Sequence, residues 1–135
     1  MSSFAASFST PENAIKTLEA AYIKKDLEAA VAARDFLNEA KLMLKNINPE
    51  LANDPEILKQ TTEVLELAFR KEMKEAGFPD FTNLKCSLGK AQNVSPSLVK
   101  LTETCIFPDG GTSTEDVHVF KSEKGWRVIN VPRKS

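Results

Sequence analysis

The chain has 135 residues, of which 41% are apolar and 27% charged, with 18 basic and 19 acidic side chains. A chain of this length forms one domain with a sizeable hydrophobic core. The balanced charge argues against a nucleic-acid-binding protein, because phosphate neutralisation needs an excess or a stripe of basic residues. We therefore expect a globular protein with no nucleic-acid partner.

The first nine residues are rich in Ser and Ala, and we expect residues 1–9 to form a flexible N-terminus before a single domain over 10–135. Phe4 and Phe8 are the residues of this segment that could pack against the domain. The segment has no positive stretch followed by an apolar one, so it predicts neither a signal peptide nor a membrane span. The expected location is cytoplasmic, without membrane contact.

Cys86 and Cys105 are the only two cysteines and are far apart in the sequence. Their spacing is not that of a redox motif or a metal site. A disulfide needs an oxidising compartment. We therefore expect two reduced thiols packed in or near the sheet core.

The first part of the chain predicts three helical stretches. The first, over 10–25, starts with a capping hydroxyl followed by proline and has apolar residues at helical spacing. The second, over 26–44, contains a bend near Asp35. The third and longest, over 55–76, has Gly77 placed to end it.

The longest predicted helix has a charged face opposite its apolar one. The apolar face contains Leu58, Leu65, Ala68, Phe69 and Met73. The simplest interpretation of the charged face is a solvated surface, and the alternative is a surface that binds a partner. It consists of Lys59, Glu63, Glu66, Arg70 and Lys74.

The second part of the chain alternates apolar and polar residues, as strands do. The runs 84–88, 98–107, 116–120 and 126–131 predict four strands, and turn residues separate the last three. Helices followed by an antiparallel meander indicate an α+β domain. Apolar residues on both parities of the last two strands suggest either a sheet that is covered on both faces or an outer face kept for association, as in a homodimer.

Two stretches resemble the nuclear transport factor 2-like superfamily. "TPENAIKTLEAAYIKKDLEAAVAARDF" resembles its first two helices, and "EKGWRVINV" resembles its last strand. The resemblance covers about residues 10–131. It implies a cystatin-like cone, in which a strongly curved antiparallel sheet wraps around the N-terminal helices and a cavity opens at the wide end.

Within this superfamily, "AAVAARDFLNEAKLML" and "FPDGGTSTEDVHVFKSEKGWRVIN" are similar to bacterial toxin-immunity proteins. This resemblance implies a non-enzymatic protein that binds and sterically neutralises a cognate toxin in competition between bacteria. Its candidate contact residues are the charged helix face described above together with Asp109, Asp116 and His118.

The alternative is a small-molecule binder or an isomerase- or dehydratase-like enzyme that uses the cone cavity, with Tyr22, Asp35 and Trp126 as candidate pocket residues. Resemblance to the isomerase branch would place its phenol at Leu18 and its base near Leu42. Both residues are apolar, so that mechanism does not carry over. The single histidine, His118, has no second ligand at metal spacing, so no metal or cofactor is predicted.

Overall fold

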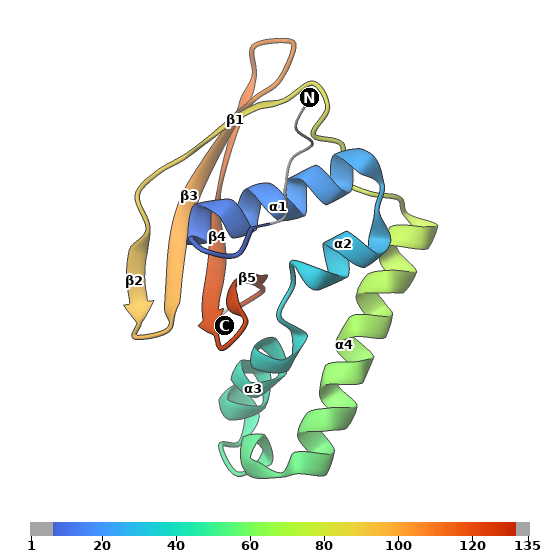
Figure 1. The fold of residues 1–135 in the computed structure, drawn as a ribbon, viewed down its shortest axis with the longest axis vertical. Helices are drawn as coiled ribbons and strands as arrows, with labels where there is room; N and C mark the ends of the chain where they lie inside the picture. Colours follow the sequence, from blue (N-terminus) through green and yellow to red (C-terminus); the bar gives the residue numbers. More distant parts are fainter. Residues whose placement is uncertain (1–6, 132–135) are drawn as a thin grey trace.

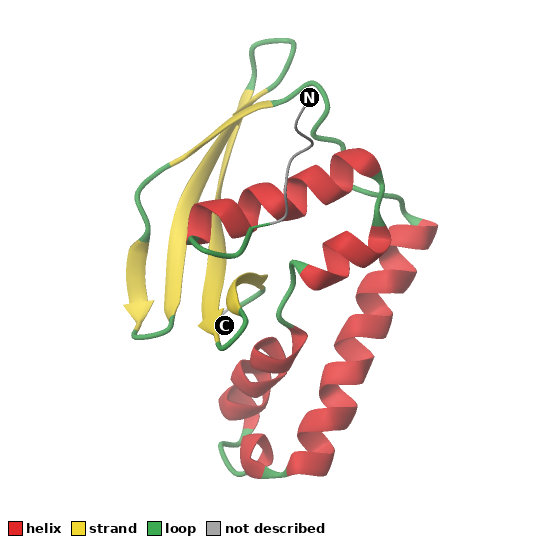
Figure 2. Cartoon of the chain, viewed as in Figure 1, coloured by secondary structure: helices red, strands yellow, loops and turns green. Residues whose placement is uncertain are grey.

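The computed structural model describes residues 7–131. Helices come first: α1 (Pro11–Lys24), α2 (Leu27–Ala32), α3 (Phe36–Ile47), the short 3-10 turn η1 (Leu51–Asn53) and α4 (Pro55–Glu75). Five strands follow: β1 (Lys85–Leu88), β2 (Gln92–Ser95), β3 (Leu98–Ile106), β4 (Thr112–Ser122) and β5 (Gly125–Ile129). The predicted α+β class is confirmed (Figures 1 and 2). None of the helices between residues 7 and 131 is long and apolar enough to cross a membrane.

The strands form one antiparallel sheet in the order β1-β3-β4-β5, and β2 also pairs with β3. β3 and β4 pair over their full common length, from Leu98 opposite Phe120 to Ile106 opposite Thr112. β5 pairs only with the second half of β4, His118–Ser122. The sequence did not predict β2, because its four residues are exposed and lack an apolar alternation.

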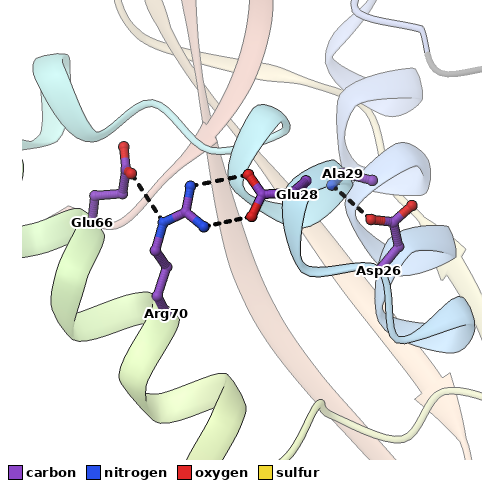
Figure 3. Close-up of polar contacts among 5 residues, drawn as sticks. All are labelled: Asp26, Glu28, Ala29, Glu66 and Arg70. Atoms are coloured by element: carbon purple, nitrogen blue, oxygen red, sulfur yellow. Dashed lines mark hydrogen bonds and ion pairs between the residues drawn. The ribbon is translucent and has the colours of Figure 1, made fainter.

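Side-chain caps begin each helix where the sequence indicates. The side-chain oxygen of Thr10 accepts a hydrogen bond from the amide of Asn13 at 3.0 Å, and Asp26 caps α2 in the same way (Figure 3). Asp35 caps α3 by accepting from the amide of Asn38 at 3.0 Å. Such caps satisfy amides that have no partner within the helix. The predicted bend near Asp35 is therefore a break between two helices.

The helices are placed in two groups around the sheet. α1 lies across one face of β3 and β4, while α3 and α4 form an antiparallel pair that extends beyond the sheet (Figure 1). α4 packs against α2 and α3. The main core joins both groups, and its buried members from the helices and the sheet are Ala14, Ile15, Leu18, Ala21, Ala30, Ala33, Phe36, Phe69, Met73, Val99, Leu101, Val119 and Val128.

The outer edge of β5 is covered by two segments from the start of the chain. The amide of Trp126 donates to the carbonyl of Phe8 at 2.8 Å, and the amide of Val128 donates to the carbonyl of Ala33 at 2.9 Å. The amide of Asp35 donates in turn to the carbonyl of Val128 at 3.0 Å. An open strand edge would invite pairing with another chain, and these contacts close it.

Residues 7–9 of the expected flexible N-terminus contact the domain, whereas residues 1–6, including Phe4, lie outside the described part. The buried hydroxyl of Thr17 accepts from the amide of Ser7 at 3.1 Å and donates to its carbonyl at 3.0 Å. Gly125 has a φ of 101°, and a Cβ there would lie 2.6 Å from the Phe8 carbonyl oxygen. Glycine is required at this close approach.

A buried ion pair joins the corner between α2 and α3 to the sheet. The Arg34 guanidinium donates to Glu39 Oε1 at 2.7 Å, and both side chains are more than nine-tenths buried. The same oxygen accepts from the amide of Asn130 at 3.0 Å. The guanidinium lies 5.0 Å from the Phe36 ring centroid and 4.9 Å from that of Phe69. The Arg34 side chain therefore contacts α3 and α4. Its partner Glu39 connects it to the end of β5.

A second ion pair lies at the surface. Arg70 on α4 donates to both carboxylate oxygens of Glu28 on α2, at 2.6 and 3.1 Å, and to Glu66 at 3.0 Å (Figure 3). The Arg70 guanidinium lowers the pKa of the exposed Glu28 carboxyl. This network connects α2 to α4 outside the core.

We expect Glu39→Ala to lower the free energy of unfolding by about 3–5 kcal/mol, because it leaves the Arg34 charge buried without its partner. Glu28→Ala, which breaks an exposed pair, serves as the matched control and should cost much less. Urea unfolding followed by circular dichroism measures both. If both variants lose the same free energy of unfolding, burial does not make the Arg34–Glu39 pair more important than the exposed pair of Glu28 and Arg70.

Candidate functional site

A cavity of about 960 Å³ opens between α1, the loop before β1, and the β3–β4 wall of the sheet. Five acidic residues border it, and none of its lining residues is a lysine or an arginine. We call this the acidic cavity. Its acidic residues are Glu19, Asp80, Glu103, Glu115 and Asp116.

The sheet register brings two of these carboxylates together. Glu103 on β3 lies directly opposite Glu115 on β4. Leu101 and Val117 form the next pair on the same face and pack in or against the core. Like charges opposite each other in a sheet are destabilising. The pairing therefore weakens the sheet at this point.

Glu19 on α1 faces the buried Glu103 carboxyl. Burial, together with a hydrogen bond and charge repulsion from Glu103, raises the pKa of Glu19 to about 9. Glu19 is then protonated at neutral pH and donates a hydrogen bond to its neighbour. A neutral carboxyl of this kind can hold a developing negative charge, or it can release its proton when a cation enters.

Tyr22 forms the aromatic part of the same cavity. Its ring stacks on Phe81 with centroids 6.1 Å apart, and it meets Phe78 at 6.2 Å in a tilted arrangement. Burial raises the pKa of the Tyr22 phenol, which the Arg34 charge opposes. Aromatic faces beside carboxylates are a common environment for organic cations.

Two of the candidate pocket residues, Asp35 and Trp126, are not among the residues that line the acidic cavity. Asp35 lines a second cavity of about 670 Å³ on the other side of α2, among five Arg and Lys side chains. Its carboxylate is used as the cap of α3. Trp126 packs against the main core, with Lys121 Nζ 5.8 Å from its ring centroid.

Asp116 and His118 are among the residues that border the acidic cavity on β4, but they alternate with Glu115 and Val117, so their side chains lie on the outer sheet face opposite Thr102 and Lys100. Asp116 accepts from the hydroxyl of Thr102 at 2.9 Å and lies 3.9 Å from Lys100 Nζ. Burial lowers the pKa of His118, although the Asp116 charge opposes this, so its imidazole is neutral at neutral pH. Asp109, the third candidate on this part of the chain, accepts from the amide of Gly111 at 2.8 Å and shapes the turn between β3 and β4.

The charged face of α4 is separate from the acidic cavity (Figure 1). Lys59, Glu63 and Lys74 are exposed. Glu66 and Arg70 are half-buried and are bound to each other and, through Arg70, to Glu28. The structure therefore divides the predicted partner-binding residues between two surfaces.

The prediction of two reduced thiols is wrong, since Cys86 and Cys105 form a disulfide. The sheet places them directly opposite each other on β1 and β3, with Cα atoms 4.0 Å apart. Their separation of 19 residues gave no sign of this contact. Disulfides persist mainly in oxidising compartments, so this bond does not support the predicted cytoplasmic location.

Sequence reasoning missed Glu19, Glu103 and Glu115, although one signal was present. Glu103 shares its strand parity with Leu101 and Cys105, and a carboxylate on the apolar parity of a strand is unusual. Glu19 lies beside apolar residues of α1 and carried no comparable signal. Glu115 lies in a polar stretch, and only the register opposite Glu103 gives it a role.

Comparisons with known proteins give similarity of structure only, as no family model and no curated protein matches the chain. A proposed NTF2-like transpeptidase from Campylobacter jejuni has a TM-score of 0.45 and 14% identity, over 90% of this chain and 99% of that one. A proposed calcium/calmodulin-dependent protein kinase type II association domain from Thiobacillus denitrificans has a TM-score of 0.49 and 15% identity, over 90% and 91%. Identities this low do not transfer function.

The architecture itself agrees with the fold that the sequence resemblance implied. α1 lies against the concave face of an antiparallel sheet, the other helices cover the sheet's β5 side, and a cavity opens beside α1 (Figure 1). The chain has an α+β fold in which helices pack against one antiparallel sheet.

We expect the free energy of unfolding to fall as the pH rises from 4.5, the ordinary pKa of a Glu carboxyl, towards about 9, the raised pKa of Glu19. The folded state holds a proton on Glu19 over this range that the unfolded chain has released, so deprotonation favours unfolding. Glu19→Gln should flatten this slope, and Glu75→Gln, at the exposed end of α4, should not. Urea midpoints across the pH range measure the slope, and an unchanged slope in Glu19→Gln would contradict the assignment.

Proposed function

We propose that this protein is a non-enzymatic binding protein whose acidic cavity receives a positively charged group of its partner. One observation carries the proposal: five acidic residues line the cavity, and within the described residues 7–131 no lysine or arginine does. The net charge of −1 does not reveal this local excess of acidic residues. A concave surface of one sign attracts and orients an oppositely charged partner.

In its specific form, we propose that the protein is an immunity protein and that the partner is a cognate bacterial toxin. The sequence resemblance supports this class of partner, and the cavity supports a basic toxin surface. A toxin that acts on a nucleic acid or another phosphate-bearing substrate needs a basic active site. An acidic inhibitor seated on that site would block it sterically.

The contact must extend beyond the cavity, because a stable complex buries about 1,200–2,000 Å² in total. The adjacent surface is the β3–β4 hairpin, on which Asp109 lies at the turn and Asp116 and His118 lie on β4. The charged face of α4 points elsewhere and is the weaker candidate for the toxin contact (Figure 1).

We expect Glu115→Lys combined with Asp116→Lys to abolish protection, because the first change places a positive charge in the acidic cavity and the second places one on the adjacent outer face of β4. Both residues are exposed, so the fold should survive. The double variant Glu63→Lys and Glu75→Lys makes the same charge change on exposed α4 positions and should protect normally. Growth of cells that co-express the toxin measures protection, and titration calorimetry measures affinity.

The toxin is first obtained by affinity capture from the native bacterium, and the captured protein must be toxic when expressed alone. Protection lost in the α4 variant but kept in the cavity variant would place the contact on α4. A captured protein without toxicity would contradict the immunity role.

The size and lining of the acidic cavity favour a second candidate function, the binding of a small organic cation. A volume of about 960 Å³ is large enough for a small molecule, and Tyr22 and Phe81 supply aromatic faces. Glu19 would also supply the protonated carboxyl that an isomerase-like reaction needs. Thermal shifts with a panel of organic ammonium ions, compared with Glu115→Lys, test this candidate.

A homodimer through the outer sheet face remains a prediction. The β3 and β4 residues on this face are largely polar, including Lys100, Thr102 and Thr114. Light scattering at micromolar concentration measures the oligomeric state.

A further inference from the structure

The disulfide lies beside the buried Glu103 carboxyl, which faces Glu19 in the acidic cavity. Cys105 and Glu103 are two residues apart on β3 and line the same cavity, and Cys86 on β1 faces Cys105. One donor atom from each of Cys86, Glu103 and Cys105 lies within 4.8 Å of the other two. Two sulfurs and a carboxylate oxygen therefore converge on one point.

We propose that the disulfide masks a metal site, and that after its reduction Cys86, Cys105 and Glu103 bind a thiophilic divalent cation such as Zn²⁺. A dithiol reductant transfers two electrons and two protons to the disulfide and is itself oxidised to a disulfide. The metal then displaces the two thiol protons and bonds to both sulfurs and to a Glu103 oxygen. The proposal is independent of the toxin-binding role.

The donor set suits this class of metal. Zn²⁺ binds thiolates at about 2.3 Å and carboxylate oxygens at about 2.0–2.2 Å in a tetrahedral arrangement. Ligand atoms in such a site lie about 3.3–3.8 Å apart, which follows from these bond lengths. The sheet holds the two cysteine Cα atoms 4.0 Å apart, so the freed sulfurs remain neighbours and need only small rotations.

A fourth ligand is close at hand. Glu19 on α1 lines the same cavity as Glu103 and offers a further oxygen donor. A divalent cation would offset the charge of the Glu103 carboxylate, which is 6% exposed and lies beside the two cysteines.

Cobalt provides the direct test, because thiolate-to-Co²⁺ charge transfer gives an ultraviolet absorption that reports sulfur ligation. The full chain is reduced with a phosphine, freed of excess reductant under nitrogen, and titrated with Co²⁺ and then Zn²⁺. We expect one ion per chain, a charge-transfer band in the reduced protein and none in the oxidised protein.

Two variants and a matched control distinguish the proposed ligands from general attraction by the acidic cavity. Glu103→Gln should weaken binding about tenfold or more, since even outer-shell changes cost 10–100-fold. Cys86→Ser should reduce the charge-transfer band to about half, since that band scales with the number of thiolate ligands. Glu115→Gln removes the same charge from the same cavity face and should leave affinity nearly unchanged.

Circular dichroism confirms the fold of each variant. The proposal is overturned if the reduced protein gives no charge-transfer band, if the oxidised protein binds equally well, or if Glu103→Gln and Glu115→Gln weaken binding alike. If Glu103→Gln does not fold, Cys86→Ser decides, and an unchanged band in that variant excludes the cysteine pair.

Discussion

The buried pair of Arg34 and Glu39 is the contact on which the rest of the arrangement depends. It lies where α2 ends and α3 begins, and Glu39 also accepts from the backbone at the end of β5. The Arg34 guanidinium between Phe36 and Phe69 brings α3 and α4 to the same point. A buried charge that loses its partner is costly, so alternative packings of these elements are disfavoured.

This junction also determines which side of the sheet stays open. The Ala33–Asp35 corner and residues 7–9 cover the edge of β5, so the helices accumulate on that side. β5 reaches only the second half of β4. The acidic cavity therefore opens beside the first half of β4, between α1 and the loop before β1.

The interior of the acidic cavity contains contacts that destabilise the folded state, unlike the remainder of the fold. Glu103 and Glu115 face each other, Glu19 adds a third carboxyl, and a disulfide lies next to them. Natural proteins break the rules of favourable packing mainly at functional sites. The second cavity is different in character, because five Arg and Lys residues line it together with three acidic residues.

By itself, the sequence determined the element types and the order of helices and strands. Capping residues such as Thr10, Asp26 and Asp54 act on their own helix, and the alternation in β3–β5 acts on its own strand, so both are visible locally. It also placed Tyr22, Asp116 and His118 among the candidate residues, though not for reasons that distinguished them from Asp35 and Trp126.

Tertiary structure alone decided the disulfide, the carboxyl cluster and the partner of Arg34. Cys86 meets Cys105, Glu103 meets Glu115, and Asn130 meets Glu39 only through strand register and helix placement. Strand register and helix placement depend on the packing of the whole core, which no local pattern of residues encodes. The physical reason is range: caps and alternation act over a few residues, whereas this site is built from α1, β1, β3 and β4 together.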